Sequence, residues 1–214
     1  MRASCSNIIL HNALITVKDE AGKILWSWHI WLTSDNISAD TYYVYSNGGF
    51  TDEVAGVVMD RNLGASSTEV NSVDSYGLLY QWGRKDPYLG SANTAGTAFA
   101  VSSRNLKVAV VDASMQTVDY SVANPHVFMF GNSKKDWVAE KNNTLWTNSV
   151  KTKYDPCPEG WRIPTSLELD ELGLNKSTVV IIDGQRGYFL SGCYTYMENS
   201  QRVFLPMAGF RNQY

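Results

Sequence analysis

Two stretches near the start of the chain predict strands, and apolar and polar residues alternate in the first of them. The first runs from Asn12 to Val17 and the second from Ile24 to Thr33, and both are rich in residues that favour strands. A polar turn at 19–23 separates them, so the pattern predicts an antiparallel hairpin. The second stretch carries large apolar side chains on both faces, so we expect both faces to be covered. His29 stands between tryptophans and is interpreted as a hydrogen-bonded core histidine rather than a ligand.

The next third of the chain is less regular. Residues 34–49 are polar and aromatic and predict a loop, and Val54 to Met59 predicts a short strand. In the compact turn that follows, Asp60 and Arg61 are expected to tie down the backbone. The block 75–88 fits a helical turn and a strand equally well.

The stretch that follows this block is the least regular part of the sequence. Trp82, within the block, is expected to be structural. A small, polar loop is expected at 90–97. Residues 101–148 predict short strands and loops, with Trp137 and Trp146 as anchors.

The segment from Asp155 to Thr165 has the most specific local signals. Thr165 and Glu168 have the spacing of a capping box, so a helix is expected at about 166–172. Trp161 is expected to be a buried core residue. Prolines restrict the backbone of this loop and of the residues before them. These prolines are Pro156, Pro158 and Pro164.

Three further β-rich runs follow the predicted helix. They lie at 178–183, 188–194 and 202–206. Gly173 is a plausible helix stop, and Asp183-Gly184 is a turn signal between the first two runs.

Composition limits the classes of partner. Of the 214 residues, 18% are charged and the net charge is −3, which does not favour nucleic acid or an anionic membrane. Seven Trp and 12 Tyr suit short strands and aromatic contact surfaces. No apolar run is long enough to span a bilayer. Met1 to Cys5 lacks the apolar segment of a signal peptide, which leaves open that the chain is a fragment of a longer protein.

Cysteine and histidine spacing indicates neither a metal site nor a redox motif. The three Cys contain no Cys-x-x-Cys pair, and the three His lie far apart, so we expect no metal and no cofactor. Cys157 and Cys193 are the favoured pair for a disulfide, because both lie in the loop-rich half of the chain. The alternative is that all three cysteines are free and mostly buried.

Five sequence blocks occur in the order in which they occur in a known group. The chain resembles the Fibrobacter succinogenes major paralogous domain (FISUMP) group, which is common in exported surface proteins of Bacteroidetes-type bacteria, including fimbrillin-like proteins and fimbrial tip subunits. The blocks are Gly22 to Trp31, Met59 to Ala65, Tyr76 to Tyr88, Tyr154 to Thr165 and Leu205 to Arg211.

A second resemblance concerns the expected fold. Trp161 to Thr165, with Glu168, is similar to a segment of the formylglycine-generating sulfatase-modifying group, which has a C-type-lectin-like fold. The resemblance implies an α+β domain of this fold at 36–214, with short strands, long loops and one or two helices. The hairpin at 1–35 either begins this domain or ends an upstream β domain. Members usually continue beyond the Leu205 block, whereas this chain stops at Tyr214, so the domain is expected to be truncated. The calcium-lectin triplets are absent.

The function that the resemblance implies is non-catalytic recognition. We expect an adhesion or ligand-recognition module at the cell surface, on a protein anchored to the outer membrane as a lipoprotein, which binds a glycan or a host protein and contacts other pilus subunits. The candidate ligand-binding residues lie on two tyrosine-rich segments that are interpreted as exposed loops, and they are Tyr42, Tyr43, Tyr45, Tyr194 and Tyr196. The alternative is that both segments are ordinary alternating strands with one buried face. The alternatives are a retroelement-diversified variable receptor, a structural pilus subunit and an enzyme of the formylglycine type. The last requires a cysteine pair at short spacing, which this sequence lacks.

Overall fold

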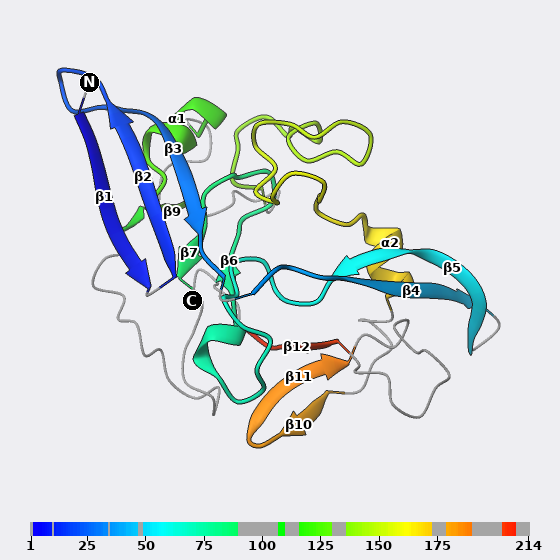
Figure 1. Ribbon diagram of the computed structural model, residues 1–214. Helices are drawn as coiled ribbons and strands as arrows, with labels where there is room; N and C mark the ends of the chain where they lie inside the picture. Colours follow the sequence, from blue (N-terminus) through cyan, green and yellow to red (C-terminus); the bar gives the residue numbers. More distant parts are fainter. Residues whose placement is uncertain are drawn as a thin grey trace.

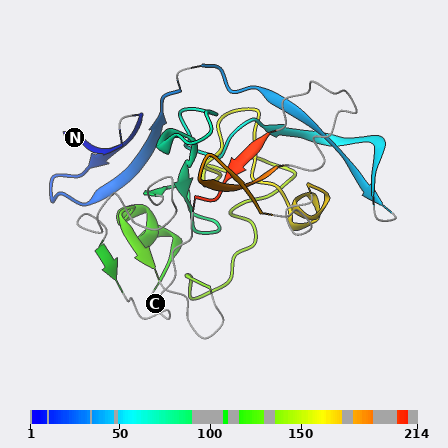
Figure 2. The same cartoon turned by 90° about the horizontal axis from the view of Figure 1, so that it is seen from below.

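The computed structural model belongs to the α+β class (Figure 1). Its elements are mainly short antiparallel strands, with two α-helices and one 3-10 helix in the residues that it describes. A sheet of three N-terminal strands and a long two-stranded ribbon lie on opposite sides of the molecule (Figures 1 and 2). The described residues are 2–9, 11–33, 35–46, 49–89, 107–109, 116–129, 136–172, 179–189 and 203–208.

The predicted N-terminal hairpin is confirmed and belongs to a three-stranded sheet of order β1-β2-β3. Asp19 closes the turn, because its carboxylate accepts from the Lys23 amide at 2.8 Å. The preceding strand β1 was not expected. The expectation that both faces of β3 are covered is wrong, since the Trp28 side chain is 51% exposed. The three strands are β1 (Arg2–Ile9), β2 (Asn12–Lys18) and β3 (Ile24–Trp31).

His29 is a hydrogen-bonded, partly buried histidine, as predicted. Its Nε2 donates to Asn12 Oδ1 at 2.7 Å, and its Nδ1 lies 3.4 Å from the Tyr80 hydroxyl. Burial lowers the His29 pKa from 6.5 to about 4. The ring is therefore neutral at physiological pH and serves the structure of the hairpin.

The hairpin is joined to the rest of the chain by side-chain hydrogen bonds. Asn12 Nδ2 donates to the Gly64 carbonyl and Trp31 Nε1 to the Ala65 carbonyl, each at 3.0 Å. Ser27 donates to Asp86 at 2.7 Å. The segments on either side of the expected domain boundary near residue 35 are thus in direct contact.

The segment predicted as a loop at 34–49 contains a strand instead. β4 (Ala39–Ser46) pairs with β5 (Gly49–Met59) in the long ribbon, and β5 includes the predicted strand 54–59. Tyr42 lies opposite Gly56, where a Cβ would come within 2.8 Å of the Tyr42 ring. The glycine therefore lets the tyrosine ring lie across the ribbon.

The ambiguous block 75–88 forms neither a helix nor one long strand. A short 3-10 helix η1 (Val73–Ser75) precedes it, and β6 (Leu78–Leu79) pairs with β7 (Tyr88–Leu89). Between the two strands the chain turns at Gly83, which has a φ of +81°.

A helix that was not expected lies between two parallel strands, β8 (Lys107–Ala109) and β9 (Val127–Met129). This helix, α1 (Val118–Ala123), is capped by Thr117, whose side chain accepts from the Tyr120 amide. Arg84 is 2% exposed and donates to backbone carbonyls at the end of α1 and the start of β9, including that of Val127 at 2.7 Å. A core cluster formed by Val127, Met129, Trp137, Val138 and Leu145 packs here. Trp137 and Trp146 are 6% and 8% exposed, so their role as anchors is confirmed.

The C-terminal part contains the predicted helix and three strands, but the middle strand, at 185–189, overlaps the predicted run at 188–194 only at Tyr188 and Phe189. Residues 190–194 lie outside the described residues. The helix α2 (Ser166–Glu171) begins at the predicted capping box, and Gly173 lies outside the described residues. β10 (Val180–Ile182), β11 (Gln185–Phe189) and β12 (Phe204–Pro206) form one antiparallel sheet, and Asp183 and Gly184 form the tight turn between β10 and β11. A second core cluster of Tyr42, Leu172 and Val203 joins the ribbon to this region. Within the described residues, no helix is long and apolar enough to cross a membrane.

Candidate functional site

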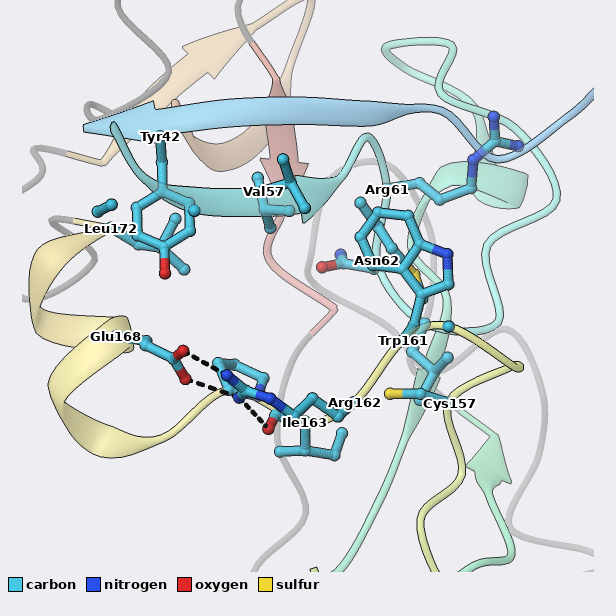
Figure 3. Close-up of a pocket in the computed structure, with 17 residues that line it drawn as sticks. Tyr42, Val57, Arg61, Asn62, Cys157, Trp161, Arg162, Ile163, Glu168 and Leu172 are labelled. Atoms are coloured by element: carbon cyan, nitrogen blue, oxygen red, sulfur yellow. Dashed lines mark hydrogen bonds and ion pairs between the residues drawn. The ribbon is translucent and has the colours of Figure 1, made fainter. Parts of the chain in front are cut away.

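An open cleft of about 400 Å³ lies between strand β5 and the loop that leads to α2 (Figure 3). Tyr42 and Leu172 stand at one end of it, and Trp161 and Asn62 at the other. Most of the remaining wall is apolar and comes from β5 and from the loop residues Ile163 and Pro164. Cleft size and lining are typical of small-ligand sites, in which a few polar groups sit within an apolar wall.

The turn after β5 holds one end of the cleft in place. Arg61 Nε donates to Asp60 Oδ1 at 2.7 Å, and its Nη2 lies 3.1 Å from Asp35 Oδ2. Asp60 also accepts from the Ser38 hydroxyl at 2.7 Å. The hydrogen bond that Arg61 donates to Asp60 raises the pKa of Arg61 despite burial. Burial raises the pKa of Asp60, but the bonds from Arg61 and Ser38 outweigh this effect and lower it. Asp60 also accepts from the Ser38 backbone amide at 3.3 Å, and Arg61 Nη2 donates to the Asn36 carbonyl at 3.4 Å, which is consistent with the expectation that these two residues tie down the backbone.

Asn62 links this turn to two distant segments. Its Nδ2 donates to the Tyr76 carbonyl at 3.1 Å and to the Pro206 carbonyl at 2.9 Å. Pro206 is 144 positions further along the chain. One side chain therefore connects the cleft wall to the central block and to β12.

Trp161 lines the cleft and is only partly buried, so its expected place in the core is wrong. Its backbone amide donates to the Pro158 carbonyl at 3.1 Å, and its carbonyl accepts from Lys151 Nζ at 2.9 Å. Gly160 has a φ of +83° and allows the sharp turn of the backbone that comes directly before Trp161. The rigid loop thus presents the indole to the cleft instead of burying it.

An ion pair between Arg162 and Glu168 forms part of the rim of the cleft (Figure 3). The Arg162 Nη1 and Nη2 atoms lie 2.8 and 2.6 Å from the two Glu168 carboxylate oxygens, a bidentate arrangement. Glu168 also completes the capping box, because its carboxylate accepts from the Thr165 amide at 2.8 Å. The bond from Arg162 lowers the Glu168 pKa to about 2 despite partial burial, with the Thr165 bonds adding to the effect. The rim therefore carries two charges that neutralise each other.

Cys157 at the wall of the cleft is a free thiol that is 8% exposed. Burial, together with the nearby Asp155 carboxylate, raises its pKa to about 12. Cys157 therefore forms no disulfide in the structure, because its thiol is free. Cys193, its predicted partner, lies outside the described residues. A thiol with such a pKa is almost entirely protonated at neutral pH and is a poor nucleophile.

Residues that were predicted to have separate ligand-binding and structural roles line the same cleft in the structure. Tyr42 is not on an exposed loop: it lies on β4 and is 5% exposed, although its ring reaches the cleft. Tyr43 and Tyr45 also lie on β4, and their side chains are outside the described part. Tyr194 and Tyr196 lie outside the described residues altogether. Four residues predicted to be structural line the cleft together with Tyr42. They are Arg61, Trp161, Pro164 and Glu168.

Several lining residues were not expected from the sequence. Ala55, Val57 and Met59 lie on β5, and Asn62 follows them in the turn. The apolar run 54–59 predicts a strand, but no local signal indicates what the strand faces.

Trp82 occupies an exposed position, although it was expected to be structural. Its side chain is 54% exposed. Its backbone has a structural role, since the Trp82 carbonyl accepts from Trp137 Nε1 at 2.5 Å, and its ring contacts that of Trp146.

Among the described residues, no group of three or more His, Cys, Asp or Glu side chains is placed to hold a metal ion. No family model matches the chain, and neither a curated protein nor a solved structure matches it.

Proposed function

We propose that this chain is a non-catalytic recognition module of the FISUMP type, with a C-type-lectin-like fold. It belongs to an exported surface or fimbrial tip protein, and it binds a glycan or a host protein in the cleft between β5 and the 155–168 loop. The residues that carry binding are Trp161 and Tyr42 at the two ends of the cleft, together with the β5 side chains between them.

The observation that carries this proposal is the indole of Trp161, which a braced loop presents to an open cleft. A loop restricted by three prolines loses little entropy when a ligand binds, and an indole provides a large contact area. The Arg162–Glu168 pair is internally neutralised and so adds polar character to the rim without net charge. Such a site favours a ligand with apolar faces and a few polar groups over a strongly charged one.

Among the described cysteine side chains, that of Cys157 is poorly suited to the formylglycine alternative. Formylglycine-type oxidation requires a reactive thiolate, whereas burial and Asp155 keep the Cys157 thiol protonated.

A binding screen with matched variants tests the proposal. Wild-type protein is applied to a broad array of glycans and cell-surface proteins, beside Trp161→Ala and Val57→Arg. Val57 lines the cleft and is 60% exposed, so Val57→Arg obstructs the cleft without removing a buried side chain. Trp28→Ala is the control, because Trp28 is exposed and lies outside the cleft.

We expect both cleft variants to bind at least roughly tenfold more weakly than the wild type, a difference of about 1.4 kcal/mol, while the control binds normally. Circular dichroism of each variant checks that the fold is intact. An array without a single hit, or hits that both cleft variants retain, would contradict the proposal.

A further inference from the structure

A second concavity, of about 350 Å³, lies beside Trp82 and is separate from the cleft. It is formed by the turn that carries Trp82 and by residues 136–145. The lining residues that matter for its chemistry are Trp82, Trp137, Asp136, Lys141, Asn142 and Asn143.

The Trp82 indole is held firmly and yet remains open to solvent. Its ring packs edge-on against Trp146, with the ring centroids 4.9 Å apart and an interplanar angle of 60°. Trp146 is itself fixed, since its Nε1 donates to the Tyr154 carbonyl at 2.8 Å. The Trp82 side chain nevertheless stays 54% exposed. A large apolar ring kept in one orientation without being covered loses little entropy when a ligand stacks on it.

The backbone beneath Trp82 is fixed as well. Gly83 has a φ of +81°, and a Cβ there would lie 2.8 Å from Leu145 Cδ1. The Trp82 carbonyl is engaged by the buried Trp137 indole. These contacts constrain the turn that carries Trp82, and Trp82 lines the concavity.

The rim of the concavity is polar but has no net charge. Asp136 and Lys141 carry opposite charges. Asn142 Oδ1 accepts from the Thr144 amide at 2.9 Å and from its hydroxyl at 2.7 Å, which fixes the side chain and leaves its NH₂ group to donate. In the part of the chain that the structure describes, no hydrogen bond engages the Asn143 side chain. Its amide can both donate and accept.

We infer that this concavity binds the pyranose ring of a neutral saccharide, with the apolar C–H face of the ring stacked on Trp82. Neighbouring hydroxyl groups on the edge of the sugar would meet the amides of Asn142 and Asn143. The pairing follows from chemistry, since a pyranose has an apolar face and an edge that both donates and accepts hydrogen bonds. The balanced charge of the rim disfavours a phosphate or a polycation. The inference rests on the proposed recognition function and extends it by a second site with a stated ligand class.

The test uses indole NMR resonances of protein labelled at tryptophan with ¹⁵N. The probes are methyl β-D-galactopyranoside, methyl β-D-glucopyranoside and methyl α-D-mannopyranoside, with acyclic sorbitol as the polyol control. The Trp82 resonance is identified by its loss in Trp82→Phe. We expect at least one glycoside to shift this resonance saturably in the millimolar range, and sorbitol to leave it unmoved.

Variants then separate stacking from general effects. Trp82→Ala should weaken glycoside binding by roughly tenfold, and Trp82→Tyr by only about threefold because an aromatic face remains. Trp28→Ala should bind the glycoside as the wild type does, because Trp28 is exposed and lines neither the cleft nor the concavity. The variants that lack Trp82 are labelled uniformly with ¹⁵N, so that the amide resonances of Asn142 and Asn143 report binding.

The outcomes also separate this inference from the proposed function. A Trp82 resonance that no glycoside moves, or glycoside binding that survives in Trp82→Ala, overturns the inference. If array hits are lost in Trp161→Ala while the Trp82 resonance stays unmoved, the cleft proposal stands and the inference fails. If a glycoside shifts the Trp82 resonance saturably but no array hit depends on Trp161, the inference stands and the cleft proposal fails.

Discussion

Replacing Glu168 with Gln should destabilise the protein in a way that depends on pH. The Glu168 carboxylate accepts from both Nη atoms of Arg162, at 2.8 and 2.6 Å, and from the Thr165 amide at 2.8 Å. A Gln side chain keeps one oxygen acceptor but turns an NH₂ group towards the guanidinium or the amide. The substitution therefore removes the ion pair and weakens the capping box together.

The size of the effect follows from the contacts and their exposure. A Glu168 pKa lowered from 4.5 to about 2 would correspond to about 3 kcal/mol if solvent screened none of it. The Arg162 side chain is 37% exposed, so the full value does not apply. An exposed ion pair contributes about 0.2–1 kcal/mol and a helix cap about 0.5–2 kcal/mol. We expect Glu168→Gln to lower the free energy of unfolding by roughly 1–2 kcal/mol at pH 7.

Acid should abolish this difference. Between the ordinary pKa of 4.5 and the folded-state value of about 2, the unfolded chain binds the proton that folded Glu168 excludes. The stability that Glu168 contributes is thus complete above pH 4.5 and is lost as the pH falls towards 2. Glu168→Gln has no carboxylate to protonate at this position, so the gap between the two proteins should close across that window.

Urea denaturation of both proteins at a series of pH values measures this gap. Glu159→Gln is the matched control, because Glu159 is exposed on the same loop and makes no hydrogen bond to any described residue. It should change the free energy of unfolding by less than about 0.5 kcal/mol. A gap for Glu168→Gln that is equally small at pH 7, or that persists unchanged at pH 2.5, roughly the acid end of the window, would refute the reasoning.

Three further predictions concern other parts of the molecule. Burial lowers the His29 pKa from 6.5 to about 4, so the free energy of unfolding should fall as the pH drops from 6.5 to 4. Urea denaturation of His29→Gln should show a smaller fall over that range, and an equal fall in both proteins would contradict this. Cys157, with its pKa raised to about 12, should resist iodoacetamide at pH 7.5 in the folded protein and react once unfolded, as mass spectrometry of its peptide reports; rapid labelling of the native thiol would show that it is accessible. Gly187→Ala would place a Cβ 2.6 Å from the Leu205 carbonyl oxygen and against the Phe204 ring, so it should lower the free energy of unfolding in urea by about 1–3 kcal/mol. Adding Phe204→Leu should recover part of this loss. An unchanged free energy of unfolding would mean that β12 can shift to accommodate the methyl group.

Local patterns predicted the elements whose signals lie within a few residues. The hairpin β2–β3 was predicted by alternation around a polar turn, and α2 by Thr165 and Glu168 at capping-box spacing. Helix α1 was missed because six residues are too few for a clear helical period, although its cap, Thr117, is visible in the sequence. The tyrosine-rich segment of β4 was predicted as a loop because its polar and aromatic residues obscured the alternation.

Burial and the cleft required the three-dimensional arrangement. Nothing near Trp161 distinguishes an indole in a core from one that faces a cleft, and the same holds for the exposed Trp82 and the buried Trp137. The cleft wall combines segments of β4, β5 and the 155–168 loop that are far apart in sequence. Such contacts depend on how elements pack, which single-sequence patterns do not encode.

The two hydrogen bonds of Asn62 also have a consequence for the order in which the chain is completed during synthesis. A ribosome makes the residues of the cleft's β5 wall long before it reaches Pro206, the carbonyl of which Asn62 binds. Until then the Asn62 amide has only its nearer partner, at Tyr76. Contacts between residues so far apart form late, because the intervening chain must first be brought together. The N-terminal hairpin can pair while the chain is still emerging, whereas this end of the cleft cannot be closed until β12 has been made.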